Sequence, residues 1–365
     1  MTAKYRSWLC GILILATAFC SKPTIQADKT VMAGGCIAIE KMTYVVKPGM
    51  YTSDGGRSGH VYYTSGGMIG AHALGIGNKY QHFMSSDGGE TWQPDPTPES
   101  GPYAAMIAWR PNPGCAGTLF RERLERVGQP GKRPISTLER STDGGKTWQI
   151  AGSHLRSPIA SNLTEIFSYR YDPIDCNTIY VSAPFEVFRG RYSGLFVSED
   201  AGETFVALMA AQGVGDIPFD VCPKNPATLY AAGTSESVWK SEDGGESWRL
   251  VGQNDYIRGS SVPVGPDQRR NVLAVDETTT IFQVLISPDR CDTVYLVTNK
   301  GIIRSENGGK TWCVMGFGID ATVPVESMVI YDKNPRIFLV GTEMGIYRTT
   351  TGGFRWQKVN LGDKK

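Results

Sequence analysis

The sequence predicts an all-β fold, specifically a six-bladed β-propeller built from four-stranded antiparallel blades. Three observations predict it. An eight-residue motif centred on Asp-Gly-Gly occurs in six copies, a Pro/Asx turn between two apolar strands recurs between the copies, and 43 of the 365 residues are glycine. Repetition at near-regular intervals is typical of a repeat architecture. A seventh blade, built from the 256–280 insertion and N-terminal residues, stays open as an alternative.

Each motif copy predicts a β-hairpin. The copies begin at residues 85, 141, 198, 241, 305 and 349. Asp-Gly and Asn-Gly favour the positive φ angles of a tight turn, and the Asp carboxylate can accept hydrogen bonds from its own loop. The turn residues are Asp87, Asp143, Asp200, Asp243 and Asn307. The closing residues, which we expect to pack between neighbouring blades, are Trp92, Trp148, Trp248, Trp312 and Trp356.

The rest of each blade follows from the segments between the motifs. A segment such as 286–295 reads as a strand, a Pro/Asp turn and a second strand, and 345–348 reads as the third strand leading into the next hairpin. The expected blade limits are 33–98, 99–154, 155–211, 212–255, 256–318 and 319–361. Since the chain ends on a fourth strand, ring closure is expected from packing between blades or from residues 30–37.

A basic residue stands directly before four of the motifs, and we interpret these residues as solvated charges at the ends of third strands. They are Arg140, Lys240, Arg304 and Arg348.

The N-terminus has the pattern of a secretory signal peptide. Lys4 and Arg6 precede an apolar run over 8–19, which is too short to span a bilayer comfortably. Cleavage after Ala18 or Ala27 fits this pattern, and a lipoprotein anchor at Cys20 is the alternative. We therefore expect residues 1–27 to be removed, and residues 28–365 to form one domain that is secreted or periplasmic and has no transmembrane segment.

Six cysteines follow the signal, and an even number in an exported chain predicts disulfides. Turns at related repeat positions in adjacent blades should be neighbours, which predicts a Cys176–Cys222 pair. A pair between Cys291 and Cys313 within one blade is the second expectation. With no CxxC and only four His, the sequence predicts no metal site and no cofactor. A net charge of +1 implies no polyelectrolyte partner, and we expect no nucleic-acid partner.

The repeated motif resembles the Asp-box (BNR) repeat, Ser/Thr-x-Asp-x-Gly-x-Thr-Trp, of sialidases and other β-propellers. The resemblance covers nearly the whole chain after the signal and implies a propeller whose ligand site lies on the face opposite the boxes. Proteins with this repeat include sialidases, xyloglucan hydrolases, sortilin-type receptors and photosystem assembly propellers. The resemblance therefore implies a fold more specifically than a function.

Chemistry in such a ring is expected where the first strands begin and the inter-blade loops converge. The candidate catalytic acids are Glu165, Asp216 and Glu326. The candidate ligand-binding residues are Arg156, Arg189, Arg191, Tyr256 and Arg258. The long insertion at 253–279 is the strongest candidate for a functional loop.

These features predict a secreted binding or assembly propeller that holds a glycan or an extracellular or periplasmic protein. The alternative is an exo-acting glycoside hydrolase of sialidase-like architecture. A sialidase needs a Phe/Tyr-Arg-Ile-Pro motif near its N-terminus, and this sequence lacks one. That absence favours the binding interpretation.

Overall fold

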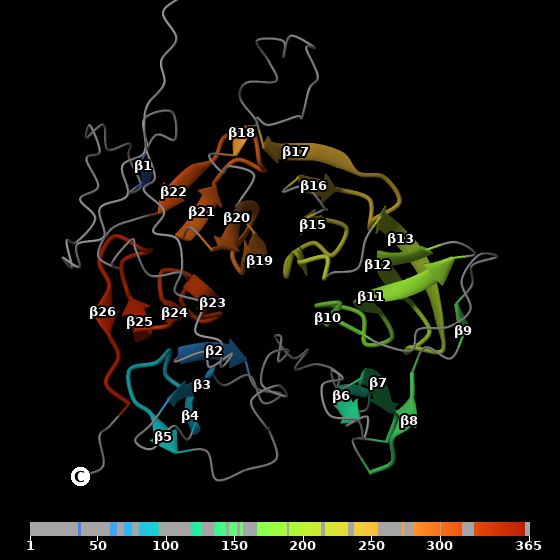
Figure 1. Ribbon diagram of the computed structural model, residues 1–365, viewed down its shortest axis with the longest axis horizontal. Helices are drawn as coiled ribbons and strands as arrows, with labels where there is room; N and C mark the ends of the chain where they lie inside the picture. The colour runs from blue at the N-terminus through green and yellow to red at the C-terminus, as the bar shows by residue number, and fades with distance from the viewer. Residues whose placement is uncertain are drawn as a thin grey trace, which may run out of the picture.

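The protein is an all-β propeller, as the sequence predicts. The computed structural model describes residues 36–37, 59–63, 69–74, 80–94, 118–125, 135–143, 146–151, 154–155, 166–187, 190–212, 216–232, 237–254, 272–273, 280–299, 301–315 and 325–361. These residues contain no helix and form six sheets, which follow one another in chain order around a common centre (Figure 1). The number of blades in the whole ring stays a prediction, because the remaining residues lie outside this description.

Each sheet is numbered here as a blade. Blade 1 has β2 (Gly59–Tyr63), β3 (Ile69–Leu74), β4 (Tyr80–Ser85) and β5 (Gln93–Pro94); blade 2 has β6 (Leu119–Glu125), β7 (Ile135–Ser141) and β8 (Gln149–Ile150). Blade 3 has β10 (Ser168–Tyr171), β11 (Ile179–Val187), β12 (Gly190–Ser198) and β13 (Thr204–Gln212). Blade 4 has β14 (Phe219–Val221), β15 (Leu229–Ala232), β16 (Val238–Ser241) and β17 (Arg249–Asn254). Blade 5 has β19 (Ile281–Ser287), β20 (Arg290–Thr298), β21 (Gly301–Ser305) and β22 (Cys313–Met315); blade 6 has β23 (Val325–Ile330), β24 (Phe338–Thr342), β25 (Gly345–Thr349) and β26 (Gln357–Lys358).

Three blades gain a fifth strand at their outer edge. The strand β9 (His154–Leu155) pairs in parallel with β13, and β18 (Val272–Leu273) pairs in parallel with β17. The strand β1 (Cys36–Ile37) pairs antiparallel with β22. The described residues of the N-terminal segment and of the 256–280 insertion thus extend blades 5 and 4.

The hydrophobic core lies between blades. Five clusters of buried side chains each join two adjacent blades, as β-branched and aromatic residues on facing sheets interlock. Four motif tryptophans pack in these clusters: Trp92 between blades 6 and 1, Trp248 between 3 and 4, Trp312 between 4 and 5, and Trp356 between 5 and 6.

The innermost strands are also joined by polar bonds. Arg170 in β10 donates from Nε to Asp220 Oδ1 in β14 at 3.2 Å, and Asp220 Oδ2 accepts from the backbone amide of Ile286 in β19 at 2.7 Å. Gln283 Oε1 in β19 accepts from the amide of Met328 in β23 at 2.8 Å. These bonds tie the inner strands of blades 3 to 6 into one belt.

Packing between blades 6 and 1 joins the two ends of the chain. Val61 N in β2 donates to Ser327 Oγ in β23 at 3.0 Å, and Arg348 Nε in β25 donates to the Gly88 carbonyl at 2.7 Å. The Tyr331 hydroxyl donates to the Ser86 carbonyl at 3.1 Å. At this junction the described residues show packing between blades, whereas β1 pairs with blade 5.

The turns between first and second strands lie beside the Asp-box hairpins on one face, which we call the lower face. The same backbone bond recurs in four blades: an amide in the box donates to a carbonyl in the adjacent turn. The pairs are Ala201 to Asn177, Gly244 to Ala227, Gly308 to Asp292 and Gly352 to Arg336, at 2.8 to 2.9 Å. The upper face is the opposite one, where first strands begin and second strands turn into third strands.

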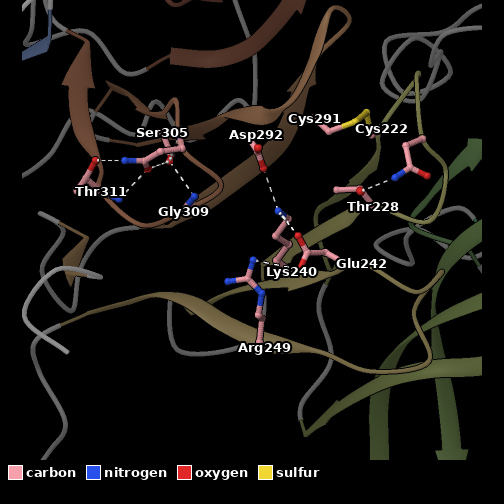
Figure 2. Close-up of polar contacts among 12 residues, drawn as sticks. Cys222, Thr228, Lys240, Glu242, Arg249, Cys291, Asp292, Ser305, Gly309 and Thr311 are labelled. Atoms are coloured by element: carbon pink, nitrogen blue, oxygen red, sulfur yellow. Dashed lines mark hydrogen bonds and ion pairs between the residues drawn. A yellow bond between two sulfur atoms is a disulfide. The ribbon is translucent and has the colours of Figure 1, made fainter. Parts of the chain in front are cut away.

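The predicted pairing of Cys176 with Cys222 is wrong, and so is that of Cys291 with Cys313. Cys222 is bonded to Cys291 (Figure 2), and Cys176 and Cys313 are each in another disulfide. Cys222 follows β14, and its neighbour across the lower face is the corresponding turn of blade 5. The disulfide does join related turns of adjacent blades, as expected, but it joins blades 4 and 5 rather than blades 3 and 4.

The interpretation of the four basic residues as solvated charges is also wrong. The side chains of Arg140, Lys240, Arg304 and Arg348 are between 4% and 16% exposed. Arg140 donates to the Ala201 carbonyl of the next blade at 3.0 Å, and Lys240 lies 3.0 Å from Asp292 of the next blade (Figure 2). The long aliphatic stems are buried while the charged ends reach acceptors. At least three of these residues therefore fasten one blade to another.

Ala201 in the third box has a backbone conformation that is unfavourable for a residue other than glycine. It has φ +57°, whereas the corresponding Gly88, Gly244, Gly308 and Gly352 have φ between +70° and +76°. An L-residue in this region costs about 1–2 kcal/mol, and glycine avoids that cost. Glycine also makes the unfolded chain more flexible, which lowers the gain in stability by about 0.4–1 kcal/mol. We expect Ala201→Gly to raise the melting temperature by about 1–3 °C in differential scanning calorimetry. An unchanged or lower value would contradict this reading of the turn.

Candidate functional site

Asp216 and Glu326 occupy equivalent positions at the upper-face ends of two innermost strands. Asp216 stands three residues before β14 in blade 4, and Glu326 is the second residue of β23 in blade 6. The innermost strand of blade 5, β19, lies between β14 and β23 and contacts both. The two predicted acids therefore stand at the upper-face ends of inner strands in alternate blades.

Phe282 at the upper end of β19 was not among the predicted site residues. Its side chain is 38% exposed, unusually open for a large apolar residue on an inner strand. The pairing of β19 with β20 shifts between Ile281 and Gln283, which makes Phe282 the extra residue of a β-bulge. The alternating sequence Ile281-Phe282-Gln283-Val284 predicts a regular strand and gave no sign of the bulge.

Bonds between inner strands relate the segments that carry these three residues. Asp220 is opposite Ile286 through their 2.7 Å bond, and Asp216 and Phe282 each stand four residues earlier in the sequence. Met328 is bonded to Gln283, and Glu326 stands two residues before Met328. The pairing of β23 with β24 shifts between Val325 and Ser327, so Glu326, like Phe282, lies at a bulge.

Asp216 carries a clear electrostatic perturbation. Surrounding protein desolvates its carboxyl and raises its pKa, while hydrogen bonds from Ser182 and Ser168 and the charge of Arg170 act in the opposite direction. The Ser168 hydroxyl donates to Asp216 Oδ1 at 3.0 Å. The residue as a whole is exposed, whereas its carboxyl is surrounded by protein and bonded to Ser168.

The other predicted site residues are not brought into this arrangement by the structure. Glu165, Arg156, Arg189, Tyr256 and Arg258 lie outside the described residues. Arg191 lies on β12 opposite Glu186 of β11, near the hairpin that joins these strands at the upper face. Their roles stay predictions.

The Asp boxes on the lower face are closed hydrogen-bonded loops. In the first, Ser85 Oγ donates to Asp87 Oδ1 at 2.7 Å and accepts from Gly89 N at 2.8 Å. Thr91 N donates to Asp87 Oδ1 at 3.0 Å, and Trp92 Nε1 donates to the Gly89 carbonyl at 3.1 Å. The Ser and Thr bonds recur at Asp143, Asp200, Asp243 and Asn307. These carboxylates hold their own turns and have a structural role.

The family model described as BNR/Asp-box repeat matches residues 139–149, which contain the second box. The chain carries a BNR/Asp-box repeat. No curated protein sequence matches the chain significantly.

Several solved structures are similar to this chain. An ancestral GH74 enzyme shares 20% identity over 70% of this chain and 32% of its own length, with a TM-score of 0.44. YCF48 bound to D1 peptide shares 15% identity over 85% and 84%, with a TM-score of 0.40. The GH93 α-L-arabinofuranosidase of Fusarium graminearum with arabinobiose shares 12% over 78% and 87%, with a TM-score of 0.40. This chain spans about a third of the GH74 enzyme's length.

Among the residues that the structure describes, no helix is long and apolar enough to cross a membrane. No three His, Cys, Asp or Glu side chains come together there as a metal site would need.

The box carboxylates predict how stability depends on pH. Hydrogen bonds from Thr147 and Ser141 lower the pKa of Asp143 to about 2, and bonds from Ser247 and Ser241 lower that of Asp243 to about 2. A carboxyl whose folded pKa lies below its unfolded value of 3.8 stabilises the fold above pH 3.8. That contribution is lost as the pH falls from about 3.8 to about 2. We expect the urea midpoint to drop across this window.

Asn307 supplies a matched control, because it forms the same loop without a titrating group. Asp243→Asn should make the decrease in the urea midpoint between pH 4 and pH 2 shallower, and Asn307→Asp should make it steeper. Equal pH profiles for the three proteins would contradict the assignment.

Proposed function

We propose that this BNR/Asp-box propeller is a binding protein that holds a glycan or a protein partner on its upper face. The observation that carries the proposal is the exposed apolar surface at the upper end of β19, where Phe282 is 38% exposed. Met344, 56% exposed between β24 and β25, adds apolar surface to the same face. Exposed aromatic and Met side chains are frequent at binding surfaces.

The lower face supports the proposal by contrast. Its box carboxylates are engaged in their own loops, and Arg140, Lys240 and Arg348 are engaged with neighbouring blades. A ligand that bound these groups would have to break their existing hydrogen bonds, which costs free energy. The upper face is therefore the better candidate for recognition.

Glycan and peptide arrays probed with the purified protein test this proposal. We expect retained ligands to bind Phe282→Ala at least tenfold more weakly. The control is Ile174→Ala, which removes a 68% exposed apolar side chain from a lower-face turn and should leave binding unchanged. Equal binding by the Phe282 variant, or loss with the Ile174 variant, would overturn the upper-face assignment.

One observation favours a second candidate, the exo-acting glycoside hydrolase. Burial raises the pKa of Asp216, which is the direction of shift that a general acid requires. The test is turnover of a fluorogenic sialoside and a panel of glycosides, repeated with Asp216→Asn and Glu326→Gln. Turnover that either substitution abolishes would establish the enzyme and overturn the binding-only proposal.

The proposal includes export. Residues 1–27 would act as a signal peptide, and residues 28–365 would be released as one domain to the periplasm or the exterior. N-terminal sequencing of the exported protein tests the cleavage, and a start at residue 1 would contradict it.

A further inference from the structure

We infer that the outer edge of blade 3 pairs with the same edge of a second copy of this chain, which joins two rings rim to rim as a dimer. The edge belongs to residues 206–212 of β13, called here the rim strand. The rim strand lies on the outer side of blade 3, away from the centre of the ring (Figure 1). The inference concerns a different surface from the upper face and does not depend on the proposed function.

The outer strands of the other five blades are protected against such pairing. An unpaired strand edge invites another chain to pair with it, and proteins ordinarily protect edges with short strands, charges or covering segments. The strands β5, β8 and β26 have two residues each, and β22 is covered by β1. The strand β17 carries Arg249, and β18 pairs with its last two residues.

The strand β13 lacks these protections over most of its length. It has nine residues, Thr204–Gln212, and none of them is charged. Within the part of the chain that the structure describes, β9 pairs with Thr204 and Phe205, and no strand pairs with the outer edge of the rim strand. Blade 3 therefore presents a long, uncharged edge, which the other blades do not.

Exposed apolar side chains surround this edge. In the rim strand itself, Val206 is 46% exposed, and Ala207 and Ala210 are exposed as well. On the neighbouring blade 2, Ile150 is 59% exposed and precedes Ala151, which packs in the same cluster as β13. Pairing at the edge would remove part of this apolar surface from water, which favours association.

A bulge at Leu208 interrupts β13, and bulges are another device that protects an edge. Here the bulge serves packing between blades. A Cβ on Gly245, in the box of blade 4, would lie 2.6 Å from Leu208 Cδ1, and the bulge of β17 brings Val251 equally close to the Cβ position of Gly309. Beyond the bulge, residues 209–212 pair in unbroken register with residues 192–195 of β12. That part of the edge is regular and can accept a partner strand.

A second copy of the chain fits this edge because the edge is compatible with itself. A two-fold axis makes two identical edge strands antiparallel, and two-fold dimers are the commonest soluble oligomers. Each residue of one rim strand would then face an uncharged residue of the other, whereas like charges across a strand pair would repel. The net charge of +1 adds little repulsion between whole chains.

Sedimentation velocity of the purified protein from about 1 to about 200 μM tests the dimer. We expect the weight-average mass to rise with concentration from that of one chain to that of two, because a strand edge forms a small, weak interface. Hydrogen exchange followed by mass spectrometry locates the contact. Peptides that cover 206–212 should exchange about threefold more slowly, or slower still, at the highest concentration, while peptides from β24 and β25 should not change.

Two substitutions test whether the rim strand makes the contact. Val206→Lys and Ala210→Lys place a charge at exposed positions of the edge, and each should raise the dissociation constant of the dimer by about tenfold or more. Met344→Lys is the matched control, since it adds the same charge at a 56% exposed position of blade 6 and should leave the dimer unchanged. Circular dichroism at the lowest concentration checks that each variant is folded.

A protein that stays monomeric up to about 200 μM would overturn the inference. So would a dimer that neither rim substitution weakens, or one that Met344→Lys dissociates. Exchange protection of 206–212 that appears only when a different protein is added would assign the edge to a foreign strand and would overturn the second copy as its partner. None of these outcomes bears on ligand binding at the upper face.

Discussion

Replacing Asp220 with alanine is expected to lower the free energy of unfolding by about 3–5 kcal/mol, because it strands a buried charge at the centre of the ring. The Asp220 carboxylate accepts from Arg170 at 3.2 Å and from the Ile286 amide at 2.7 Å, so it joins blades 3, 4 and 5. The side chains of Arg170 and Asp220 are only 6% and 10% exposed. Chemical denaturation followed by tryptophan fluorescence measures the loss.

A surface ion pair provides the matched comparison. Arg140 and Glu203 lie 2.9 Å apart, closer than Arg170 and Asp220, but Glu203 is 63% exposed. Exposed pairs contribute about 0–1 kcal/mol, so Glu203→Ala should cost less than about 1 kcal/mol. Similar losses for the two variants would show that the inner belt contributes no more than the surface does.

The hairpins were predictable because their information is local. Asp87, Gly89 and Thr91 make their bonds within a few residues of one another, so the residue types at fixed spacing determine the turn. Five of the six copies carry Asp or Asn at the same place, and the loops that the structure describes repeat the same bonds. The strands between them follow from alternation and turn residues in the same way.

The disulfide was harder because it depends on the direction of the ring. Cys176 and Cys291 hold the same place in the repeated turn, one in blade 3 and one in blade 5, and Cys222 lies in the blade between them. The repeat pattern makes both of them neighbours of blade 4. Only the three-dimensional offset between adjacent turns selects Cys291.

The burial of the basic residues was missed for a related reason. Periodicity showed that Arg140 and Lys240 recur with the box, but their acceptors lie about 50–60 residues away in the next blade. A charged side chain at a strand end is ordinarily solvated. Its burial here depends on backbone carbonyls and carboxylates that only the assembled ring presents.

The candidate acids were chosen from topology. Asp216 and Glu326 were proposed because first-strand ends in a propeller converge, and their roles stay predictions. Phe282 was missed because a bulge, rather than composition, turns it outward. Irregularities of this kind arise from packing between blades, for which the sequence offers no local signal.

Gly309→Ala is the second substitution with a large expected effect, about 2–5 kcal/mol in the free energy of unfolding. Gly309 has φ +85°, where an L-residue costs about 1–2 kcal/mol. A Cβ there would lie 2.6 Å from Val251 Cβ, and forcing space in a packed core costs about 1–3 kcal/mol more. Val251 belongs to blade 4, and its carbonyl accepts from Trp312 Nε1 at 3.0 Å. The added methyl would therefore push on the residue that anchors the box tryptophan across the blade junction.

Gly244→Ala separates the two contributions, because Gly244 has φ +76° but no atom within 4 Å of the Cβ position. It should cost only the conformational part, about 1–2 kcal/mol. The difference between the variants, measured by urea denaturation, reports the steric contribution of the blade 4–5 junction. If Gly309→Ala and Gly244→Ala cost the same, the second glycine of the box is required for its φ angle alone, and close contact between blades plays no part in its selection.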